Sequence, residues 1–284
     1  MTVHDAAWLE AQYNNRARIP DHGALFERWR QASEVARQGS PAAMLNQPYG
    51  PSADETLDVF PARQANAPIL VFIHGGYWRS LSKNDHSFVA PALVGSGATV
   101  VVPDYSLCPA VRIEDIALQM VRALAWVWQH AGDWGGQRER IVVAGHSAGG
   151  HLAAMLLTCR WRDWAPELPP QLVHGALSIS GLYDLEPLRQ TPFLQADLQL
   201  TPASVRRLSP AFFPRPRRPL MAVAGGDESQ EFLRQNLLIR HQWGPTSVPV
   251  CETLSGRHHL DVLHSLADEK GRLHHLACRL LGLT

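Results

Sequence analysis

Short apolar runs alternate along this chain with longer amphipathic stretches. Runs of four to six mostly apolar residues, many of them β-branched, are typical of strands buried on both faces of a sheet. The strands predicted in this way cover residues 56–60, 68–73, 98–102, 141–144, 175–180, 220–224 and 248–253. Helices are predicted near residues 85–93, 113–130, 148–157, 228–242 and 259–281. This alternation indicates an α/β fold, with a mostly parallel central sheet and helices on both of its faces.

Two segments lie outside the alternation. Residues 5–39 have a helical pattern and lead into a Pro/Gly-rich connection at residues 40–52, so we expect residues 1–50 to form an N-terminal helical cover. Residues 186–218 are rich in proline and leucine without a clear period, which predicts a small cap-like insertion. Because the alternation is otherwise continuous, all 284 residues are expected to form one domain, residues 1–284.

Composition narrows the range of partners. The formal net charge of zero offers no electrostatic reason to bind nucleic acid or an anionic membrane, and the arginines at residues 215–218 suit a solvated loop. The four cysteines are far apart, and no signal peptide precedes the first predicted helix. We therefore expect a cytoplasmic protein with reduced thiols that acts on a small molecule, with a homodimer as an alternative to a monomer.

The segment from Ile141 to Gly150 carries the clearest chemical signal. It runs from an apolar strand into Gly-His-Ser-Ala-Gly, and an alanine-rich helical stretch follows. A sharp strand-to-helix turn there would expose the hydroxyl of Ser147 beside the N–H groups of the helix N-terminus. Side chains at Gly145 and Gly149 would collide with the neighbouring strand and helix. The segment resembles the nucleophile elbow of α/β-hydrolases.

A serine nucleophile needs a base and an orienting acid, which follow it in this order: serine, acid, histidine. The run at 220–224 ends in Gly-Gly-Asp-Glu-Ser, which places Asp227 and Glu228 at the rim of the sheet where Ser147 lies. Asp227 is the better acid candidate. Glu228 is the alternative, and its charge would also suit the start of the next helix.

The base must come from the loop after the last strand. That loop contains two adjacent histidines, His258 and His259, which point in different directions. Only one of them can face Ser147. The other histidines do not form a cluster with metal-ligand spacing, so we predict no metal site.

An oxyanion hole completes the required set. His74-Gly75-Gly76-Tyr77-Trp78 follows the strand at 68–73, and adjacent glycines let backbone N–H groups approach a substrate. Gly75 and Gly76 are the candidate donors from this loop, with Tyr77 a further candidate. Ala148, directly after the nucleophile, is predicted to supply another donor.

Taken together, these motifs resemble the kynurenine formamidases (arylformamidases), an esterase/lipase-like group of α/β-hydrolases. The resemblance spans roughly residues 55–270. It rests on His74–Trp78 and on residues 145–152, with further matches at residues 105–109, 134–136, 180–185, 209–210 and 227–235. In that family the catalytic histidine is followed by an aromatic or aliphatic residue and often by aspartate. His259-Leu260-Asp261 has this form, so the resemblance favours His259 as the base.

The resemblance implies hydrolysis of N-formyl-L-kynurenine to L-kynurenine and formate, through a formyl-enzyme and without a metal or organic cofactor. Tyr77 and Trp78 would either contact the aromatic substrate or pack beneath the loop, and His258 would shape its loop or line the pocket. A broad short-acyl carboxylesterase, aryl amidase or carbamate hydrolase of the same fold is the alternative. A binding protein that lacks catalysis is disfavoured, because every required residue type is present.

Overall fold

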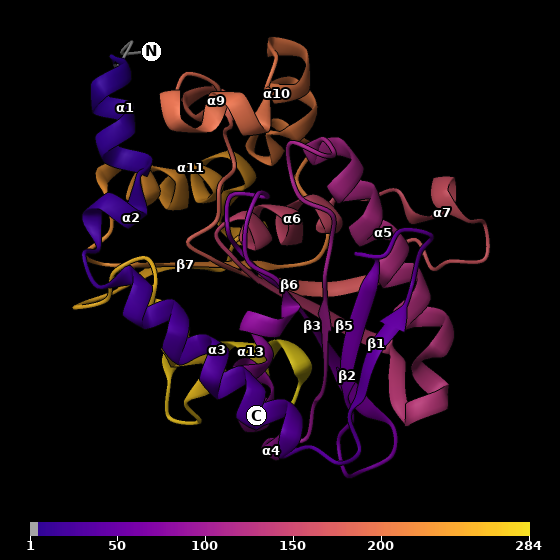
Figure 1. Cartoon of the computed structure of the whole chain (residues 1–284). Helices are drawn as coiled ribbons and strands as arrows, with labels where there is room; N and C mark the ends of the chain where they lie inside the picture. Colours follow the sequence, from indigo (N-terminus) through magenta and orange to yellow (C-terminus); the bar gives the residue numbers. More distant parts are fainter. Residues whose placement is uncertain (1–4) are drawn as a thin grey trace.

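In the computed structural model, which describes residues 5–284, eight strands form one sheet in the order β1-β2-β4-β3-β5-β6-β7-β8 (Figure 1). The strands are β1 (Met44–Pro48), β2 (Thr56–Phe60), β3 (Ala67–Ile73), β4 (Thr99–Pro103), β5 (Gly136–His146), β6 (Val173–Ile179), β7 (Leu220–Gly225) and β8 (Val250–Leu254). Strand β2 pairs antiparallel with both β1 and β4, and all other pairs are parallel. The predicted α/β fold with a mostly parallel sheet is confirmed.

Both faces of the sheet are buried, as strand β3 shows. Ile69, Val71 and Ile73 belong to one apolar cluster, whereas Leu70 and Phe72 belong to a second cluster on the opposite face. Successive side chains of a strand point to opposite faces, so an unbroken apolar run can fill two cores at once. This double burial explains why the strands read as continuous apolar stretches in the sequence.

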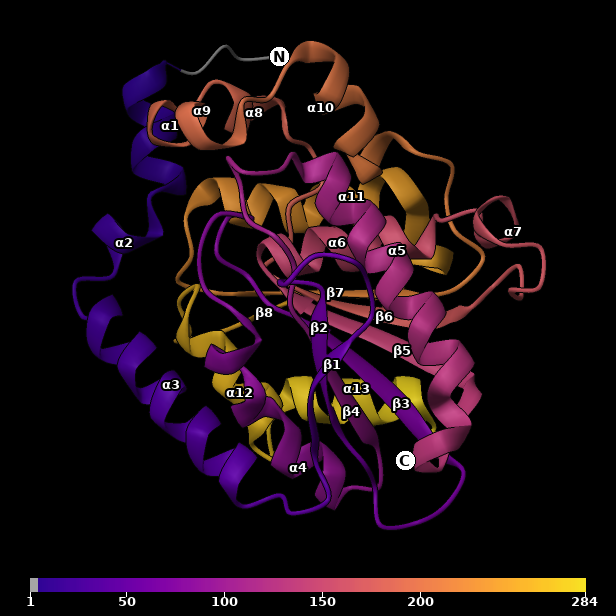
Figure 2. The same cartoon turned by 45° about the vertical axis from the view of Figure 1, so that its right-hand side comes forward.

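Helices cover the two faces (Figure 2). The long helices α5, α6 and α11 contribute to the first cluster, and α3, α4 and α13 contribute to the second. The helices are α1 (Ala6–Tyr13), α2 (Asn15–Arg18), α3 (His22–Gln38), α4 (Ala90–Gly95), α5 (Ile113–His130), α6 (Ala148–Leu157), α7 (Trp161–Trp164), α8 (Glu186–Arg189), α9 (Pro192–Leu198), α10 (Pro202–Leu208), α11 (Gln230–Ser247), α12 (His264–Ala267) and α13 (Arg272–Leu281).

The N-terminal helices and the segment at 186–218 meet above the carboxyl ends of the strands. Helix α1 contacts α8 and α9, and both views show α1 beside α9 (Figures 1 and 2). The predicted helical stretch at residues 5–39 is divided into α1, α2 and α3, with a break at Asn14 and another between α2 and α3. These breaks turn the chain around the rim of the sheet.

Two local predictions differ from the structure. The connection predicted at residues 40–52 contains strand β1, which pairs with β2 at the edge of the sheet. Strand β1 is only partly buried and includes an asparagine with positive φ, Asn46, so it lacks the apolar run used to predict strands. Helix α11 extends beyond the predicted end at residue 242, with a kink at Gly244.

The structure also bears on membranes and cysteines. Among residues 5–284, no helix combines the length and apolar character needed to cross a bilayer. All four cysteines are free thiols.

Candidate active site

Ser147 occupies the turn between β5 and α6. Its backbone has φ 56° and ψ −114°, a conformation that a residue with a side chain rarely adopts. The turn is fixed to the end of β6, because the Ser147 N–H donates to the carbonyl oxygen of Ile179 at 2.8 Å. Such strained conformations persist where the surrounding structure holds them, and they concentrate at active sites.

The two glycines of the pentapeptide are required by close packing. A Cβ at Gly145 would lie 2.1 Å from the carbonyl oxygen of Gly149, and a Cβ at Gly149 would lie 2.0 Å from that of Ile73. Both contacts are to backbone, which cannot rotate away. The predicted strand–turn–helix around Ser147 and its need for glycine are confirmed.

His259 lies beside the serine. Its Nε2 is 3.0 Å from the Ser147 Oγ, and the imidazole is almost fully buried against the ring of Phe232. His146, the residue before the nucleophile, donates from Nε2 to the carbonyl oxygen of His259 at 2.7 Å. Burial, and then the neighbouring His259, lower the pKa of His146 well below its usual value, so His146 remains a neutral donor. The loop that carries His259 is thereby tied to the elbow.

The carboxylate that faces His259 belongs to Glu228, and the prediction of Asp227 is wrong in the structure. Glu228 Oε2 lies 2.7 Å from His259 Nδ1, and its side chain is completely buried. The other oxygen, Oε1, accepts hydrogen bonds from the N–H of Gly225 at 2.6 Å and from the Ser180 hydroxyl at 2.5 Å. Ser147, His259 and Glu228 thus form one continuous chain of hydrogen bonds.

The turn after β7 explains the difference. Asp227 occupies the exposed part of this turn, where its N–H donates to the carbonyl oxygen of Arg257 at 2.9 Å. Glu228 comes one residue later, immediately before the N-cap Ser229 of α11, and its longer side chain folds back under the turn. A carboxylate one position before a helix N-cap was the available sequence signal. Sequence reasoning had treated it as part of the helix start.

His258 turns away from the serine and stabilises its own loop. Its Nδ1 accepts hydrogen bonds from the N–H groups of Leu260 at 3.1 Å and Asp261 at 3.2 Å. Its own N–H donates to Asp261 Oδ1 at 2.7 Å. His258 is absent from the wall of the cavity at Ser147, so of its two predicted positions the structure shows the loop-shaping one.

The loop after β3 lies against the elbow. A Cβ at Gly75 would lie 2.9 Å from the carbonyl oxygen of His146, so Gly75 allows the close approach. Gly76 and Tyr77, both with positive φ, line the cavity at Ser147. In residues 5–284, no carbonyl oxygen accepts the N–H of Gly76 or Tyr77. The N–H of Ala148, first in α6, has no partner within its helix.

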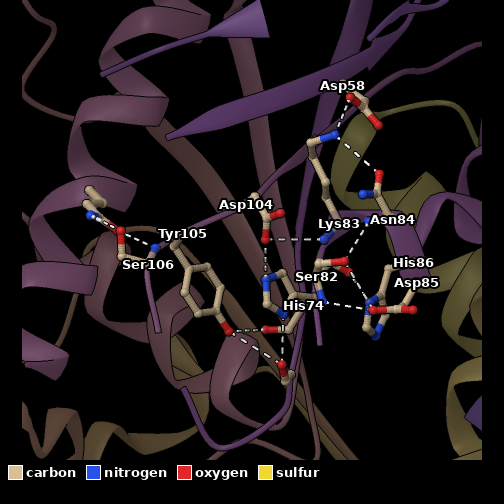
Figure 3. A network of polar contacts seen from close by, with 12 residues as sticks. Asp58, His74, Ser82, Lys83, Asn84, Asp85, His86, Asp104, Tyr105 and Ser106 are labelled. Atoms are coloured by element: carbon tan, nitrogen blue, oxygen red, sulfur yellow. Dashed lines mark hydrogen bonds and ion pairs between the residues drawn. The ribbon is translucent and has the colours of Figure 1, made fainter. Parts of the chain in front are cut away.

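A buried polar network stands behind this loop (Figure 3). His74 Nδ1 lies 2.8 Å from the carbonyl oxygen of Gly75, and its Nε2 lies 3.1 Å from Asp104 Oδ1. The ring of Tyr105 stacks on the His74 ring at 4.1 Å, and its hydroxyl donates to the His74 carbonyl oxygen at 3.0 Å. Contacts on both sides of the His74 ring therefore fix the backbone that leads into Gly76.

The network continues to the edge of the sheet. The Lys83 N–H donates to Asp104 Oδ1 at 3.3 Å, and Lys83 Nζ lies 2.8 Å from Asp58 Oδ1 on β2. Both side chains of this ion pair are buried. Asn46 on β1, the strand missed in the sequence, accepts a further hydrogen bond from Lys83 Nζ at 2.6 Å. Strands β1 and β2 thus help to hold the loop after β3.

The Ser147 hydroxyl opens into a cavity of about 260 Å³. Its aromatic walls are Phe26 and Trp29 of α3, Tyr77, and Phe193 of the cap. Trp29 is held by stacking on Phe88 at 5.6 Å and by a hydrogen bond from its Nε1 to His264. Sequence reasoning missed the walls supplied by α3 and the cap, because nothing in their local pattern relates them to Ser147.

Of the two aromatic residues predicted near the substrate, only Tyr77 lines the cavity. Its hydroxyl donates to the carbonyl oxygen of Tyr13 at 2.7 Å, which ties the loop to the N-terminal cover. Trp78 is fully buried, packs edge-on against His151 at 5.0 Å and does not line the cavity, so of its two predicted positions the structure shows the packed one. Within the described residues, no group of three or more histidine, cysteine or acidic side chains has the geometry of a metal site.

Comparison with known proteins shows that this chain is similar to hydrolases. A family model of the alpha/beta hydrolase fold matches residues 70–237. The kynurenine formamidase of Danio rerio is 31% identical over 249 residues, which covers 84% of this chain and 82% of that protein. The esterase LipC of Mycobacterium tuberculosis is 34% identical over 152 residues, 51% of this chain and 38% of LipC.

A solved structure supports the same placement. A candidate thioesterase from Silicibacter sp. TM1040 is 29% identical and superposes with a TM-score of 0.82, over 93% of this chain and 97% of that one. The similarity therefore extends across the sheet, the cover and the cap. The chain belongs to the α/β-hydrolase family and, within it, to the kynurenine formamidase-like members, and it is an enzyme, a serine hydrolase of this fold.

Proposed function

We propose that this enzyme hydrolyses N-formyl-L-kynurenine to L-kynurenine and formate. The observation that carries the proposal is the connected chain Ser147–His259–Glu228, which opens into a small cavity with aromatic walls. A flat aryl group fits against such walls, and aromatic contacts contribute substantially to its binding. The relatives named kynurenine formamidase cover most of this chain, which supports the same substrate here.

The reaction begins with a tetrahedral intermediate on Ser147. Ser147 Oγ attacks the formyl carbon while His259 Nε2, 3.0 Å away, takes the hydroxyl proton. Glu228 holds the His259 Nδ1–H and stabilises the imidazolium that forms. The N–H groups of Gly76, Tyr77 and Ala148 stabilise the negative oxygen of the tetrahedral intermediate. Gly75, predicted from the sequence as a donor, does not line the cavity; in this assignment it allows the loop to approach the elbow.

Departure of the aryl amine leaves a formyl-enzyme, and hydrolysis of this ester then releases formate. The imidazolium of His259 gives its proton to the aryl nitrogen, the C–N bond breaks, and the aryl amine of kynurenine departs. Water then attacks the formyl ester on Ser147, with His259 again taking a proton. Collapse of this second tetrahedral intermediate returns the proton to Ser147 Oγ and releases formate.

A second candidate is hydrolysis of short aryl or alkyl carboxyl esters. Half of this chain resembles the esterase LipC, and the cavity walls are largely apolar. The same serine, base and donors serve ester cleavage, since the tetrahedral intermediate has the same charge. The leaving group distinguishes the two reactions, because an aryl amine needs the proton from His259 more than an aryl oxide does.

The test compares kcat/KM for N-formyl-L-kynurenine with kcat/KM for 4-nitrophenyl acetate, using the purified full chain. We expect the formamide to be preferred, and Ser147→Ala to reduce both activities at least a thousandfold with an unchanged circular dichroism spectrum. A marked preference for the acetate would reject the formamidase assignment. Retained activity in Ser147→Ala would reject the serine mechanism itself.

A further inference from the structure

The cavity at Ser147 has a positive rim. Arg16 and Arg79 are among its lining residues, and no aspartate or glutamate of residues 5–284 lines it. Arg79 is neutralised, because its guanidinium pairs with Asp197 of the cap and donates to the carbonyl oxygen of Phe193 at 3.0 Å. Arg79 therefore serves to hold the cap against the loop after β3.

Arg16 differs from Arg79 in having no carboxylate partner in the described part of the chain. Its guanidinium lies over the ring of Phe26, with Cζ 5.6 Å from the ring centroid, and its Nη2 is 3.4 Å from Ser80 Oγ. Phe26 and Ser80 also line the cavity. The cation is therefore positioned at the cavity, with most of its donors still available.

Asn15, the preceding residue, supplies a second unpaired donor. It lines the same cavity and is 8% exposed, and its Nδ2 has no hydrogen-bond partner within residues 5–284. An unpaired buried amide destabilises the protein, so a ligand that accepts this hydrogen bond gains by doing so. The helix that carries both residues, α2, is a single turn between two breaks in the chain.

We propose that Arg16, assisted by Asn15, binds a carboxylate on the substrate and thereby selects aryl formamides that carry an α-carboxylate. The proposal rests on the function proposed above, in which the substrate has an aryl formamide at one end and an α-carboxylate at the other. Ser147 and its donors act on the first end. Guanidinium groups match carboxylates in geometry and charge, which makes Arg16 the specificity-determining residue for the second end.

The test measures how strongly the enzyme distinguishes N-formyl-L-kynurenine from N-formylkynuramine, which lacks only the carboxylate. In Arg16→Gln we expect the ratio of the two kcat/KM values to fall about tenfold or more, chiefly through KM, as one charge-assisted hydrogen bond is lost. Arg16→Lys should retain part of the ratio. Arg18→Gln is the matched control, because Arg18 lies on the same helical turn, is exposed and does not line the cavity.

An unchanged ratio in Arg16→Gln, or an equal fall in Arg18→Gln, would overturn the proposal. Inhibition of 4-nitrophenyl acetate hydrolysis by L-kynurenine separates this failure from a failure of the proposed function. If the protein cleaves neither formamide, the formamidase assignment falls, yet the carboxylate site still predicts that Arg16→Gln raises the inhibition constant of L-kynurenine about tenfold. Absence of inhibition at millimolar L-kynurenine would also reject the site.

Discussion

Exchange of Glu228 for glutamine isolates the role of its charge. The Gly225 N–H and the Ser180 hydroxyl both donate to Oε1, so the carbonyl oxygen of the new amide must occupy that position. Its NH₂ group then takes the place of Oε2, 2.7 Å from His259 Nδ1. An NH₂ group can only donate there, so His259 carries its proton on Nε2 and cannot accept one from Ser147.

The size of the effect follows from this geometry. In the transition state the imidazolium of His259 loses a neutralising carboxylate, worth about 4 kcal/mol for charges roughly 4 Å apart at an effective dielectric constant near 20. Each 1.36 kcal/mol changes the rate about tenfold, so this loss alone slows the reaction about a thousandfold. The wrong tautomer adds to it, and the same carboxylate-to-amide change in a serine protease triad lowers kcat about 10⁴-fold. We expect Glu228→Gln to lower kcat by 10³- to 10⁴-fold.

Asp227→Asn is the control for this change, since Asp227 is exposed and neighbours Glu228 in the chain. We expect its kcat to stay within about threefold of the unmodified enzyme, because surface substitutions away from special features have small effects. Initial rates with N-formyl-L-kynurenine and with 4-nitrophenyl acetate give kcat, and thermal unfolding checks the fold of each variant. A loss in Asp227→Asn as large as that in Glu228→Gln would refute the assignment of the acid.

Three further changes test the loop, the buried ion pair and the buried histidines. Gly76→Ala places a Cβ 2.0 Å from a backbone carbonyl oxygen, so the loop must shift, and we expect kcat to fall about 10²- to 10³-fold together with a lower melting temperature. Lys83→Met leaves the buried Asp58 carboxylate without its cation, with only the Asn46 N–H still donating to Oδ1. It should lower the free energy of unfolding in urea by about 3–5 kcal/mol, with most of it recovered in Lys83→Met/Asp58→Leu. Burial lowers the pKa of His151 to about 4. Below pH 6.5 the unfolded chain therefore binds a proton that the folded chain does not. The free energy of unfolding then falls as the pH drops from 6.5 towards 4, by up to about 1.4 kcal/mol per pH unit. His151→Gln should reduce the slope of unfolding free energy against pH, whereas the exposed His275→Gln should not.

The nucleophile and the sheet were predictable because their signals are local. The strand before Ser147, the turn and the helix after it follow one another in the chain, and the two glycines are required by contacts within this unit and with β3. The strands were predictable for a related reason. Strands β3, β4 and β7 are buried along their whole length because helices cover both faces of the sheet, and this gives each of them a continuous apolar run in the sequence.

The acid was harder to predict, because the decision depends on a turn of three residues. Asp227 and Glu228 are adjacent in the chain and both follow the end of β7 closely, so the sequence places either of them at the rim of the sheet. The two residues differ in which side chain points into the protein. The Glu228 side chain does so and accepts a hydrogen bond from Ser180, which follows a different strand, β6. Strand β1 was missed for a similar reason. It is stabilised by pairing with β2 and by Lys83, not by an apolar run of its own.

The cavity walls mark the limit of sequence reasoning most clearly. Residues 14–29 and Phe193 are far from Ser147 in the chain, and their own patterns predict only a short helical cover and an irregular cap. They reach the site because α1 packs on the cap helices and because Tyr77 and Arg79 tie the loop after β3 to both segments. Such contacts are tertiary, so no window of sequence contains them.

This arrangement separates the chemistry from the choice of substrate. Ser147, Glu228 and the proposed oxyanion donors lie at or shortly after the ends of sheet strands, and His259 lies in the loop after β8; a network that extends to the edge of the sheet supports them. The surfaces that a substrate touches away from the reacting bond come from the cover and the cap, which contact the sheet mainly through side chains. Substitutions in α2, α3 or the cap can therefore alter which acyl aryl compound is bound without moving Ser147 relative to His259. A formamidase and an esterase can share one catalytic centre for this reason, and residues such as Arg16 are where the two are expected to differ.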